Sequence, residues 1–310
     1  MTDKTIHEIL YNESLKKAKF KAWVFSDLQQ RDPKNAESCL KICTSDFIES
    51  GLSADVMWYL GDAVEGKDLD HLSKMSVMQE KAFSEIGIPL CFVMGNHDME
   101  YTNSIKETDI PPTLPFWETV KKHPGWTTTE HCSDWFFKQT YGDLTVFFLG
   151  DHVAEDQSWR VFHQNLPDPF EKYPLEDRIA RLKAEIEAEK GPVITASHYP
   201  YPGGNRPSAL LEKLLPLPDN VVLHLYGHAH IGDYKWAKEN AYRRISGVDW
   251  HDIPQIDVSS FENIRGYVCR SVFLHVYEDN SMGLFFRDHD HRCFTECYFP
   301  SARKYPSFLK

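Results

Sequence analysis

Short apolar runs recur along the chain, and most of them end at polar or charged residues. Between them lie stretches in which apolar residues recur every three or four positions, which indicates amphipathic helices. The predicted strands cover residues 20–26, 56–60, 89–94, 144–149, 193–196, 221–226, 271–277 and 282–287. The clearest predicted helices cover residues 36–50, 71–86 and 175–190. Strands that alternate with helices predict a layered α/β fold.

The same pattern predicts one large domain. Residues 1–19 form a polar N-terminal arm, and residues 20–310 contain no stretch that resembles an inter-domain linker. Residues 99–135 interrupt the regular pattern with several prolines and aromatic residues, which predicts an insertion. This insertion either closes over a substrate as a lid or packs as a flap on the core. Its most informative side chains are Tyr101, Trp117, His123 and Trp126.

Composition narrows the range of partners and compartments. The chain has 34 basic and 46 acidic residues, a net charge of −12, which argues against nucleic acid or an anionic membrane as the main partner. A small phosphorylated substrate, such as a nucleotide, remains compatible because bound cations reverse the local field. The N-terminus lacks a secretory signal, and no stretch is long and apolar enough to span a membrane.

Cysteine usage indicates a cytoplasmic protein. The 7 cysteines include no C-x-x-C pair, which fits reduced thiols in a cytoplasmic protein. Cys293 and Cys297 allow two interpretations, a small metal site or two thiols on a strand. The absence of partner ligands nearby in the sequence favours the second.

Residues that can bind metal ions follow the predicted strands. In layered α/β folds, binding sites form beyond the carboxyl ends of the strands. Each residue alone is weak evidence, because an Asp after a strand is usually a turn or cap residue and a lone His is usually structural. Their joint occurrence carries the argument. The candidates are Asp27, Asp62, Asn96, His198, His228 and His230.

These candidates favour a site with two metal ions. If the chain is extended here, two ions on either side of a shared ligand could use both His228 and His230. Carboxylate, amide and imidazole ligands suit Mn²⁺, Fe, Zn²⁺ or Mg²⁺. Two such cations about 3.5–4 Å apart can each bind a phosphate oxygen and hold a bridging hydroxide as the nucleophile. Such a pair of ions fits phosphoryl chemistry.

With these motifs the chain resembles the calcineurin-like metallophosphoesterase superfamily. The matching motifs lie within residues 26–230 and are Ser-Asp-Leu-Gln at 26–29, Gly-Asp-Ala-Val-Glu at 61–65, Gly-Asn-His-Asp at 95–98, Ser-His-Tyr-Pro at 197–200 and Gly-His-Ala-His at 227–230. The resemblance implies a four-layer αββα sandwich of two mixed β-sheets flanked by helices. It also implies a dinuclear centre between the sheets.

The resemblance also assigns the ligands residue by residue. One metal ion would be held by Asp27, Asp62 and His230. The second ion would be held by Asp62 together with Asn96, His198 and His228. Asp62 would bridge the two ions.

Two further positions of the family pattern concern catalysis. His97 is similar to the family's non-ligand histidine, which would stabilise developing charge or protonate the leaving group. Asp98 would fix the tautomer of His97, and it is also a candidate helix cap. Arg206 follows a glycine-rich stretch, where it either clamps a phosphate or is an ordinary surface charge.

Gln29 departs from the family pattern, which usually has a histidine at this position. An amide oxygen is a harder and weaker ligand than an imidazole, so the first site should bind more weakly or prefer Mn²⁺ or Mg²⁺. Three interpretations remain open: Gln29 binds the metal, it binds a metal-bound water, or the first site is empty in purified protein. His152 is a candidate replacement ligand, although an ordinary loop residue is the simpler interpretation.

The Asp-x-Gln pattern also resembles the branch of Mn²⁺-dependent ADP-ribose/CDP-alcohol diphosphatases, which favours Mn²⁺. The predicted function is therefore a metal-dependent hydrolase of phosphodiester or pyrophosphate bonds. The alternatives are a phosphomonoesterase and a non-catalytic metal-binding scaffold of the same fold. A DNA nuclease is disfavoured, because the chain is acidic and has no basic stripe.

Overall fold

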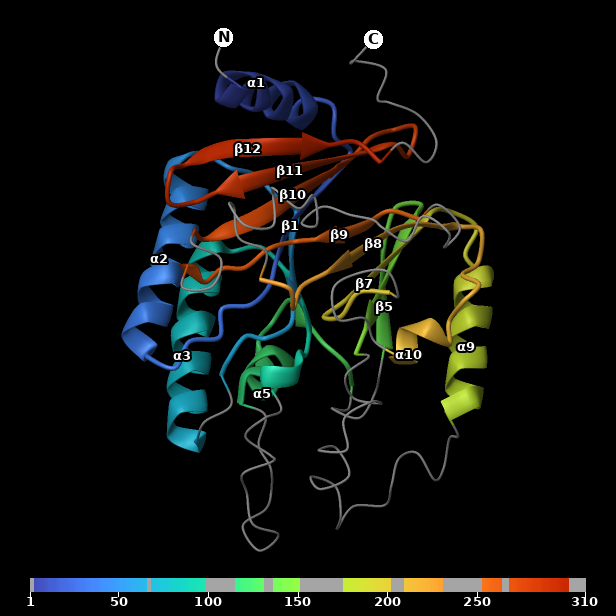
Figure 1. The fold of residues 1–310 in the computed structure, drawn as a ribbon, viewed down its shortest axis with the longest axis horizontal. Coiled ribbons are helices and arrows are strands. Elements are labelled where there is room, and N and C mark those ends of the chain that lie inside the picture. Colours follow the sequence, from blue (N-terminus) through green and yellow to red (C-terminus); the bar gives the residue numbers. More distant parts are fainter. Residues whose placement is uncertain are drawn as a thin grey trace, which may run out of the picture.

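Two β-sheets stand face to face at the centre of the molecule (Figure 1). The computed structural model describes residues 3–65, 68–98, 115–130, 136–150, 175–201, 209–230, 253–263 and 268–300. The seven-stranded sheet has the order β12-β11-β10-β1-β2-β3-β4, and the five-stranded sheet has the order β5-β6-β7-β8-β9. Both sheets are mixed, because each combines parallel and antiparallel pairs.

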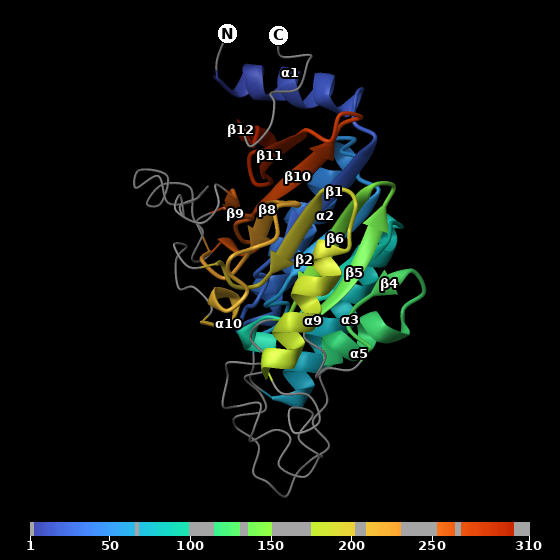
Figure 2. The same cartoon turned by 90° about the vertical axis from the view of Figure 1, so that its right-hand side faces the viewer.

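The strands of the larger sheet are β1 (Phe20–Phe25), β2 (Val56–Leu60), β3 (Leu90–Val93), β4 (Trp126–Thr127), β10 (Arg270–Val276), β11 (Met282–Asp288) and β12 (Cys293–Tyr298). The strands of the smaller sheet are β5 (Phe136–Tyr141), β6 (Leu144–Leu149), β7 (Val193–Ser197), β8 (Val221–Tyr226) and β9 (Gln255–Asp257). Helices α2 (Pro33–Glu49), α3 (Leu69–Ile86) and α5 (Pro115–Lys122) lie on the outer side of the larger sheet, and α9 (Leu175–Glu187) and α10 (Ala209–Glu212) lie on the outer side of the smaller one (Figures 1 and 2).

Side-chain alternation along β1 shows how the layers are built. Ala22 and Val24 face the apolar core between the sheets, whereas Trp23 and Phe25 face the helical layer. Successive side chains of a strand point to opposite faces, so a strand buried on both sides is apolar throughout. The predicted α/β fold with two mixed sheets flanked by helices is confirmed.

The helix ends follow local chemistry. Asp32 accepts a hydrogen bond from the Lys34 backbone at the start of α2, and Asp68 accepts one from the His71 backbone at the start of α3. Such caps satisfy backbone donors that have no partner within the helix. Helix α3 ends at Gly87, whose φ of 75° suits a residue without a side chain. These two helices fix the loops that follow β1 and β2.

The N-terminal arm contains a helix, α1 (Asp3–Leu15), which packs on β11 and β12. Its Tyr11 is buried against Phe273, Phe285 and Phe294. Among the described residues, no helix has both the length and the apolar character that a membrane span requires.

Part of the predicted insertion belongs to the layered core. Helix α5 lies within it, and β4 pairs with β3 at the edge of the larger sheet. Phe116 is buried against Tyr59 and Phe92, and the His123 ring stacks on Trp126 at 3.9 Å. Residues 115–130 therefore pack on the core of the larger sheet. Tyr101 lies outside the described residues.

The C-terminal strand explains Cys293 and Cys297. Both residues lie on β12, and neither forms a disulfide among the described residues. The Cys297 sulfur lies 3.4 Å from Nδ1 of His7 on α1. The described residues place neither thiol in a group of potential metal ligands.

Candidate metal centre

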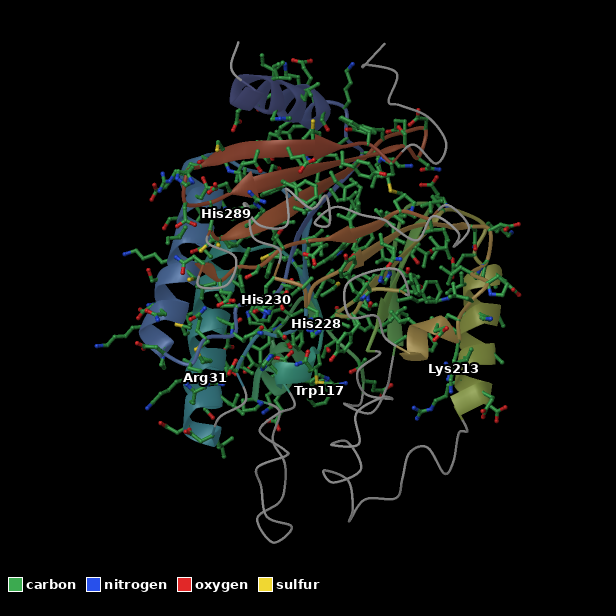
Figure 3. All side chains as sticks on the ribbon, viewed as in Figure 1. Arg31, Trp117, Lys213, His228, His230 and His289 are labelled. Atoms are coloured by element: carbon green, nitrogen blue, oxygen red, sulfur yellow. The ribbon has the colours of Figure 1, made fainter. Side chains whose placement is uncertain are left out.

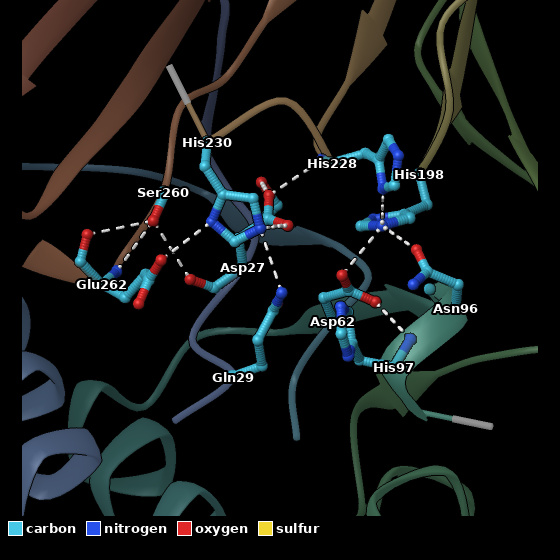
Figure 4. Close-up of polar contacts among 12 residues, drawn as sticks. Asp27, Gln29, Asp62, Asn96, His97, His198, His228, His230, Ser260 and Glu262 are labelled. Carbon is cyan, nitrogen blue, oxygen red and sulfur yellow. Dashed lines mark hydrogen bonds and ion pairs between the residues drawn. The ribbon is translucent and has the colours of Figure 1, made fainter. Parts of the chain in front are cut away.

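The candidate ligands converge because their strands end at the same side of the sandwich. Strands β1, β2 and β3 are parallel neighbours, and Asp27, Asp62 and Asn96 follow them. Strands β7 and β8 are parallel neighbours in the facing sheet and lead into the candidate histidines. Figure 3 shows His228 and His230 near the middle of the molecule, and Figure 4 shows the ligand cluster.

Backbone geometry at these strand ends is unusual. The φ angle is 57° at Asp27, 54° at Asp62, 67° at His228 and 48° at His230. Side-chain-bearing residues rarely adopt such angles, which occur mostly where the surrounding structure enforces them. Left-handed turns replace the extended backbone that the sequence suggested for His228 and His230. The two imidazoles still reach different groups of ligands.

Gly61 shows how closely the loops pack. Its φ is 87°, and a Cβ placed there would lie 2.7 Å from both the Gly95 nitrogen and Nδ1 of His198. The loops after β2 and β3 and the His198 ring therefore meet without room for a side chain.

One group of donor atoms surrounds Nε2 of His198. This nitrogen lies 3.1 Å from Asp62 Oδ2, 3.2 Å from Asn96 Oδ1 and 3.2 Å from His228 Nδ1. Asp62 and His198 are fully buried. This group contains the residues that the sequence predicts for the second metal ion.

The hydrogen bonds of His198 show what this group can hold. Its Nδ1 donates to the Leu60 carbonyl at 2.8 Å, so in the neutral ring Nε2 presents a lone pair. Asp62 and Asn96 present oxygen atoms to the same point. Electron pairs that converge in a buried space repel one another unless a cation lies between them. The donor set therefore fits a divalent metal ion.

The second group lies around His230 and shares Asp62 with the first. Asp27, Asp62 and His230 bring one donor atom each to within 4.8 Å of one another. His230 Nε2 lies 3.2 Å from Asp27 Oδ1. Oδ1 of Asp27 and Oδ2 of Asp62 are buried and accept no hydrogen bond from the described residues. Unsatisfied buried carboxylate oxygens are costly without a cation, so this group also fits a metal ion.

Gln29 reaches this second group. It is 1% exposed, and its amide nitrogen lies 3.0 Å from Nε2 of His230. Its Oε1 atom is buried without a hydrogen-bond partner among the described residues. A half-turn of the amide exchanges the nitrogen and the oxygen, which would direct Oε1 toward a cation. The geometry is thus compatible with Gln29 as a ligand, which the sequence left open.

His97 lies at the edge of the cluster with Glu65 beside it. The His97 backbone N–H donates to Asp62 Oδ1 at 2.8 Å, and its Nδ1 lies 3.5 Å from Glu65 Oε2. The His97 side chain is 20% exposed, whereas Glu65 is buried. Glu65 therefore places a buried carboxylate near the His97 ring.

The prediction that Asp98 fixes the His97 tautomer is wrong. Both Asp98 oxygens instead accept hydrogen bonds from backbone N–H groups, at 2.7–3.1 Å. The donors are Asp62, Ala63, Val64 and Gly95. Asp98 thus ties the loop after β2 to the loop after β3. Its side chain turns back toward the chain that precedes it, as carboxylates in the first helical turn often do.

Sequence reasoning missed a carboxylate that follows the short strand β9. Glu262 is 1% exposed, and its Oε1 lies 3.0 Å from His230 Nδ1. Its Oε2 accepts a hydrogen bond from Gln30. Residues 253–262 alternate apolar with polar residues, so no uninterrupted apolar run marked this segment in the sequence. Arg206 and His152 lie outside the described residues.

Electrostatics within the cluster favour a bound positive charge. Burial opposes ionisation of Asp62, but the neighbouring His198 holds the pKa of the Asp62 carboxyl well below its usual range. Burial also opposes protonation of His198, yet Asp62 raises the pKa of that imidazole to about 10. The cluster therefore attracts a proton strongly, and a divalent cation competes for the same place.

Comparison with known proteins supports this view of the fold. A purple acid phosphatase from seeds of yellow lupin (Lupinus luteus) superimposes with a TM-score of 0.53 at 12% identity, over 90% of this chain and 53% of that one. GAP50, the anchor in the inner membrane complex of Plasmodium, gives 0.56 at 13% identity, over 91% and 89%. The protein TT1561 of Thermus thermophilus gives 0.51 at 14% identity, over 91% and 99%.

At these identities the structural similarities concern the fold alone. The chain spans about half the length of the lupin phosphatase. Comparison with curated protein sequences gives no match. The sequence profile of the calcineurin-like phosphoesterases matches residues 20–232, which include every candidate ligand. The chain therefore belongs to the calcineurin-like phosphoesterase family.

Proposed function

We propose that this protein is a hydrolase of phosphodiester or pyrophosphate bonds that uses two divalent metal ions. The observation that carries the proposal is the pair of buried ligand groups that share Asp62. Family membership supports a metal-dependent phosphoesterase. A shared carboxylate is what a two-metal site needs, because it holds both ions close to one phosphate group.

The residues around the ligands have separable tasks. When bound, the two cations would supply Lewis acidity and an activated water at neutral pH. His97 would stabilise the developing charge or protonate the leaving oxygen, and Glu65 would keep its imidazole oriented. Asp98 would keep the Asp62 loop in place through its four backbone hydrogen bonds.

Gln29 supports the choice of metal and substrate class. Its amide replaces an imidazole beside His230, and a hard oxygen ligand favours Mn²⁺ over softer-binding ions. We propose Mn²⁺ as the preferred metal and nucleoside diphosphate compounds such as ADP-ribose as the substrates to test first. The chain is acidic and its described cysteines form no disulfide, which suggests a cytoplasmic enzyme that acts on small phosphorylated molecules.

Reconstitution with metal tests the proposal. Protein stripped with chelator and reloaded with Mn²⁺, Mg²⁺, Zn²⁺ or Fe²⁺ should be assayed on ADP-ribose, a CDP-alcohol, a cyclic nucleotide, a generic diester and a monoester. We expect turnover of a diester or pyrophosphate substrate, highest with Mn²⁺. Turnover of the monoester alone would favour a phosphomonoesterase, and inactivity with every metal would contradict the enzyme assignment.

Asp62→Asn separates an enzyme from a scaffold. The substitution keeps the shape of the side chain but removes the charge that both ligand groups share. We expect turnover to fall at least about 100-fold while the protein remains folded. Unchanged turnover would show that the activity does not come from this site. A scaffold would have no turnover to lose and would keep its partners in the variant.

A further inference from the structure

The segment after β9 is attached to the end of β1. The Phe261 backbone N–H donates to the Ser26 carbonyl at 2.9 Å, and the Phe261 ring stacks on Phe25 at 4.2 Å. Ser260 Oγ lies 3.2 Å from the Asp27 carbonyl and 3.0 Å from the Glu262 backbone nitrogen. These contacts hold the Glu262 backbone in a fixed position relative to Asp27.

The Glu262 side chain uses both carboxylate oxygens within the protein. Oε1 lies 3.0 Å from His230 Nδ1, and Oε2 accepts a hydrogen bond from Gln30. The neighbouring Gln29 approaches the other side of the same imidazole, at Nε2. Figure 4 shows His230 with Glu262 on one side and Asp27 and Gln29 on the other. A buried carboxylate beside Nδ1 attracts the ring proton to that nitrogen and leaves Nε2 with its lone pair.

We infer that Glu262 is a positioning residue that holds His230 in the Nδ1–H tautomer and so makes its Nε2 an effective ligand of the first metal site. The inference rests on the proposed metal centre. It adds the residue that prepares the first and weaker of the two sites to bind its metal ion. The Nε2–H tautomer would direct a proton at Asp27 and Gln29, where the metal has to bind.

This role concerns the first metal site, where Gln29 is a weak ligand. Gln29 supplies an amide where an imidazole would bind more strongly, so the first metal ion depends more on its other ligands. A carboxylate beside the remote ring nitrogen of a ligand imidazole strengthens that imidazole as a metal ligand. Glu262 thus offsets part of the metal affinity that is lost because Gln29 supplies an amide and not an imidazole. Gln30 contributes by fixing the orientation of Glu262.

Mn²⁺ titration of chelator-stripped Glu262→Ala and Glu262→Gln tests this role. Calorimetry reports the affinity of each bound equivalent, and the Mn²⁺ electron paramagnetic resonance signal shows whether two exchange-coupled ions are present. We expect the affinity of one equivalent to fall about 10–100-fold in Glu262→Ala and the other to stay unchanged. Glu262→Gln, which keeps an acceptor oxygen without the charge, should lose less. Glu85→Ala, on the exposed surface of α3, is the matched control and should bind as the parent does.

A double-mutant cycle with His230→Ala decides whether Glu262 acts through the imidazole. If it does, Glu262→Ala causes no further loss of affinity in the His230→Ala background. An equal loss in both backgrounds, or unchanged affinity in both Glu262 variants, would contradict the inference. Thermal unfolding in chelator shows that the variants are folded. The measurement is metal affinity, so it does not depend on catalytic activity. If the parent protein is inactive but Glu262→Ala still binds metal more weakly than the parent, the proposed function is refuted and the role of Glu262 stands.

Discussion

Asp27, Asp62, His228 and His230 combine burial or partial burial with a left-handed backbone. A residue with a Cβ in this conformation costs about 1–3 kcal/mol, so the surrounding contacts must hold it there. The Asp27 backbone N–H donates to the Gly61 carbonyl at 3.0 Å, and the His228 N–H donates to Asp27 Oδ2 at 3.0 Å. Backbone strain at these positions is therefore linked to the ligand positions themselves, which favours a site that is preorganised before metal binds.

Gln29 is where a single substitution should change metal preference. Gln29→His would restore an imidazole beside His230, so we expect tighter Zn²⁺ binding at the first site. Gln29→Ala removes the amide and should weaken Mn²⁺ at the same site by at least about tenfold. Competitive titration with Mn²⁺ and Zn²⁺ measures both effects. Identical Mn²⁺ affinity in Gln29→Ala would show that the amide does not bind the metal ion.

At the residue scale, the sequence predicted which side chains lie close together more accurately than it predicted the role of each one. The ligands follow predicted strands, so their convergence is a consequence of parallel pairing. Asp98 was assigned to His97 because the two are adjacent in sequence. Adjacent side chains in a helical turn point in different directions, and Asp98 turns toward the backbone donors of two loops instead. The carboxylate near the His97 ring is instead that of Glu65, which lies well before His97 in the sequence.

Helix α2 is fixed to the larger sheet by a buried ion pair far along the chain. Arg287 on β11 donates from Nε and Nη2 to the two oxygens of Asp46, each at 2.8 Å. His289 Nδ1 lies 2.8 Å from the same carboxylate, and Arg287 also reaches Glu8 on α1. Burial opposes its ionisation, but Arg287 and His289 hold the pKa of Asp46 well below its usual range. One carboxylate thus joins helix α2 to strand β11, which follows it by some 240 residues.

Asp46→Asn should therefore destabilise the whole fold. The substitution leaves the Arg287 guanidinium buried beside a neutral amide, which costs about 3–5 kcal/mol. Chemical denaturation at neutral pH measures the loss. Asp70→Asn is the matched control, because Asp70 makes an exposed pair with Lys74 within α3 and should change stability little. If Asp46→Asn loses no more unfolding free energy than Asp70→Asn does, the buried pair adds no stability beyond that of an exposed pair.

At the element scale, length and periodicity decided what sequence could predict. Strands β2, β6 and β8 were predicted at their observed bounds, because each is an uninterrupted apolar run. Strand β9 was missed, because its three residues are too few for a periodic signal. Glu262 was missed with it. Strand β5 alternates exposed with half-buried residues at the edge of its sheet, and that weak contrast hid it as well.

At the scale of the whole molecule, each sheet buries a neutral histidine outside the metal cluster. His224 lies on β8, and burial lowers the pKa of its imidazole to about 3. His275 lies on β10, and burial lowers its pKa to about 3 as well. His224 contacts Thr195 at 2.9 Å, and His275 contacts Ser14 on α1 at 2.5 Å. Each sheet therefore contains a base that gains a proton when the chain unfolds.

These two histidines should make stability depend on pH below neutrality. Between pH 6.5 and pH 3 the unfolded imidazole binds a proton that the folded one does not, so each histidine lowers the free energy of unfolding as the pH falls. From pH 7 to pH 5 the loss is about 2 kcal/mol per residue at most. Asp98 acts in the opposite direction, because burial and the nearby Asp62 raise its pKa to about 7. The free energy of unfolding of the parent can therefore change little with pH even when both histidines contribute.

The difference between variant and parent isolates the histidines, because the contribution of Asp98 is common to both. His224→Gln and His275→Gln should each lose less unfolding free energy between pH 7 and pH 5 than the parent, as measured by urea denaturation of chelator-treated protein. The residues lie in different sheets, so the two differences should add in the double variant. A parent and double variant with the same pH dependence would mean that these imidazoles are protonated in the folded state.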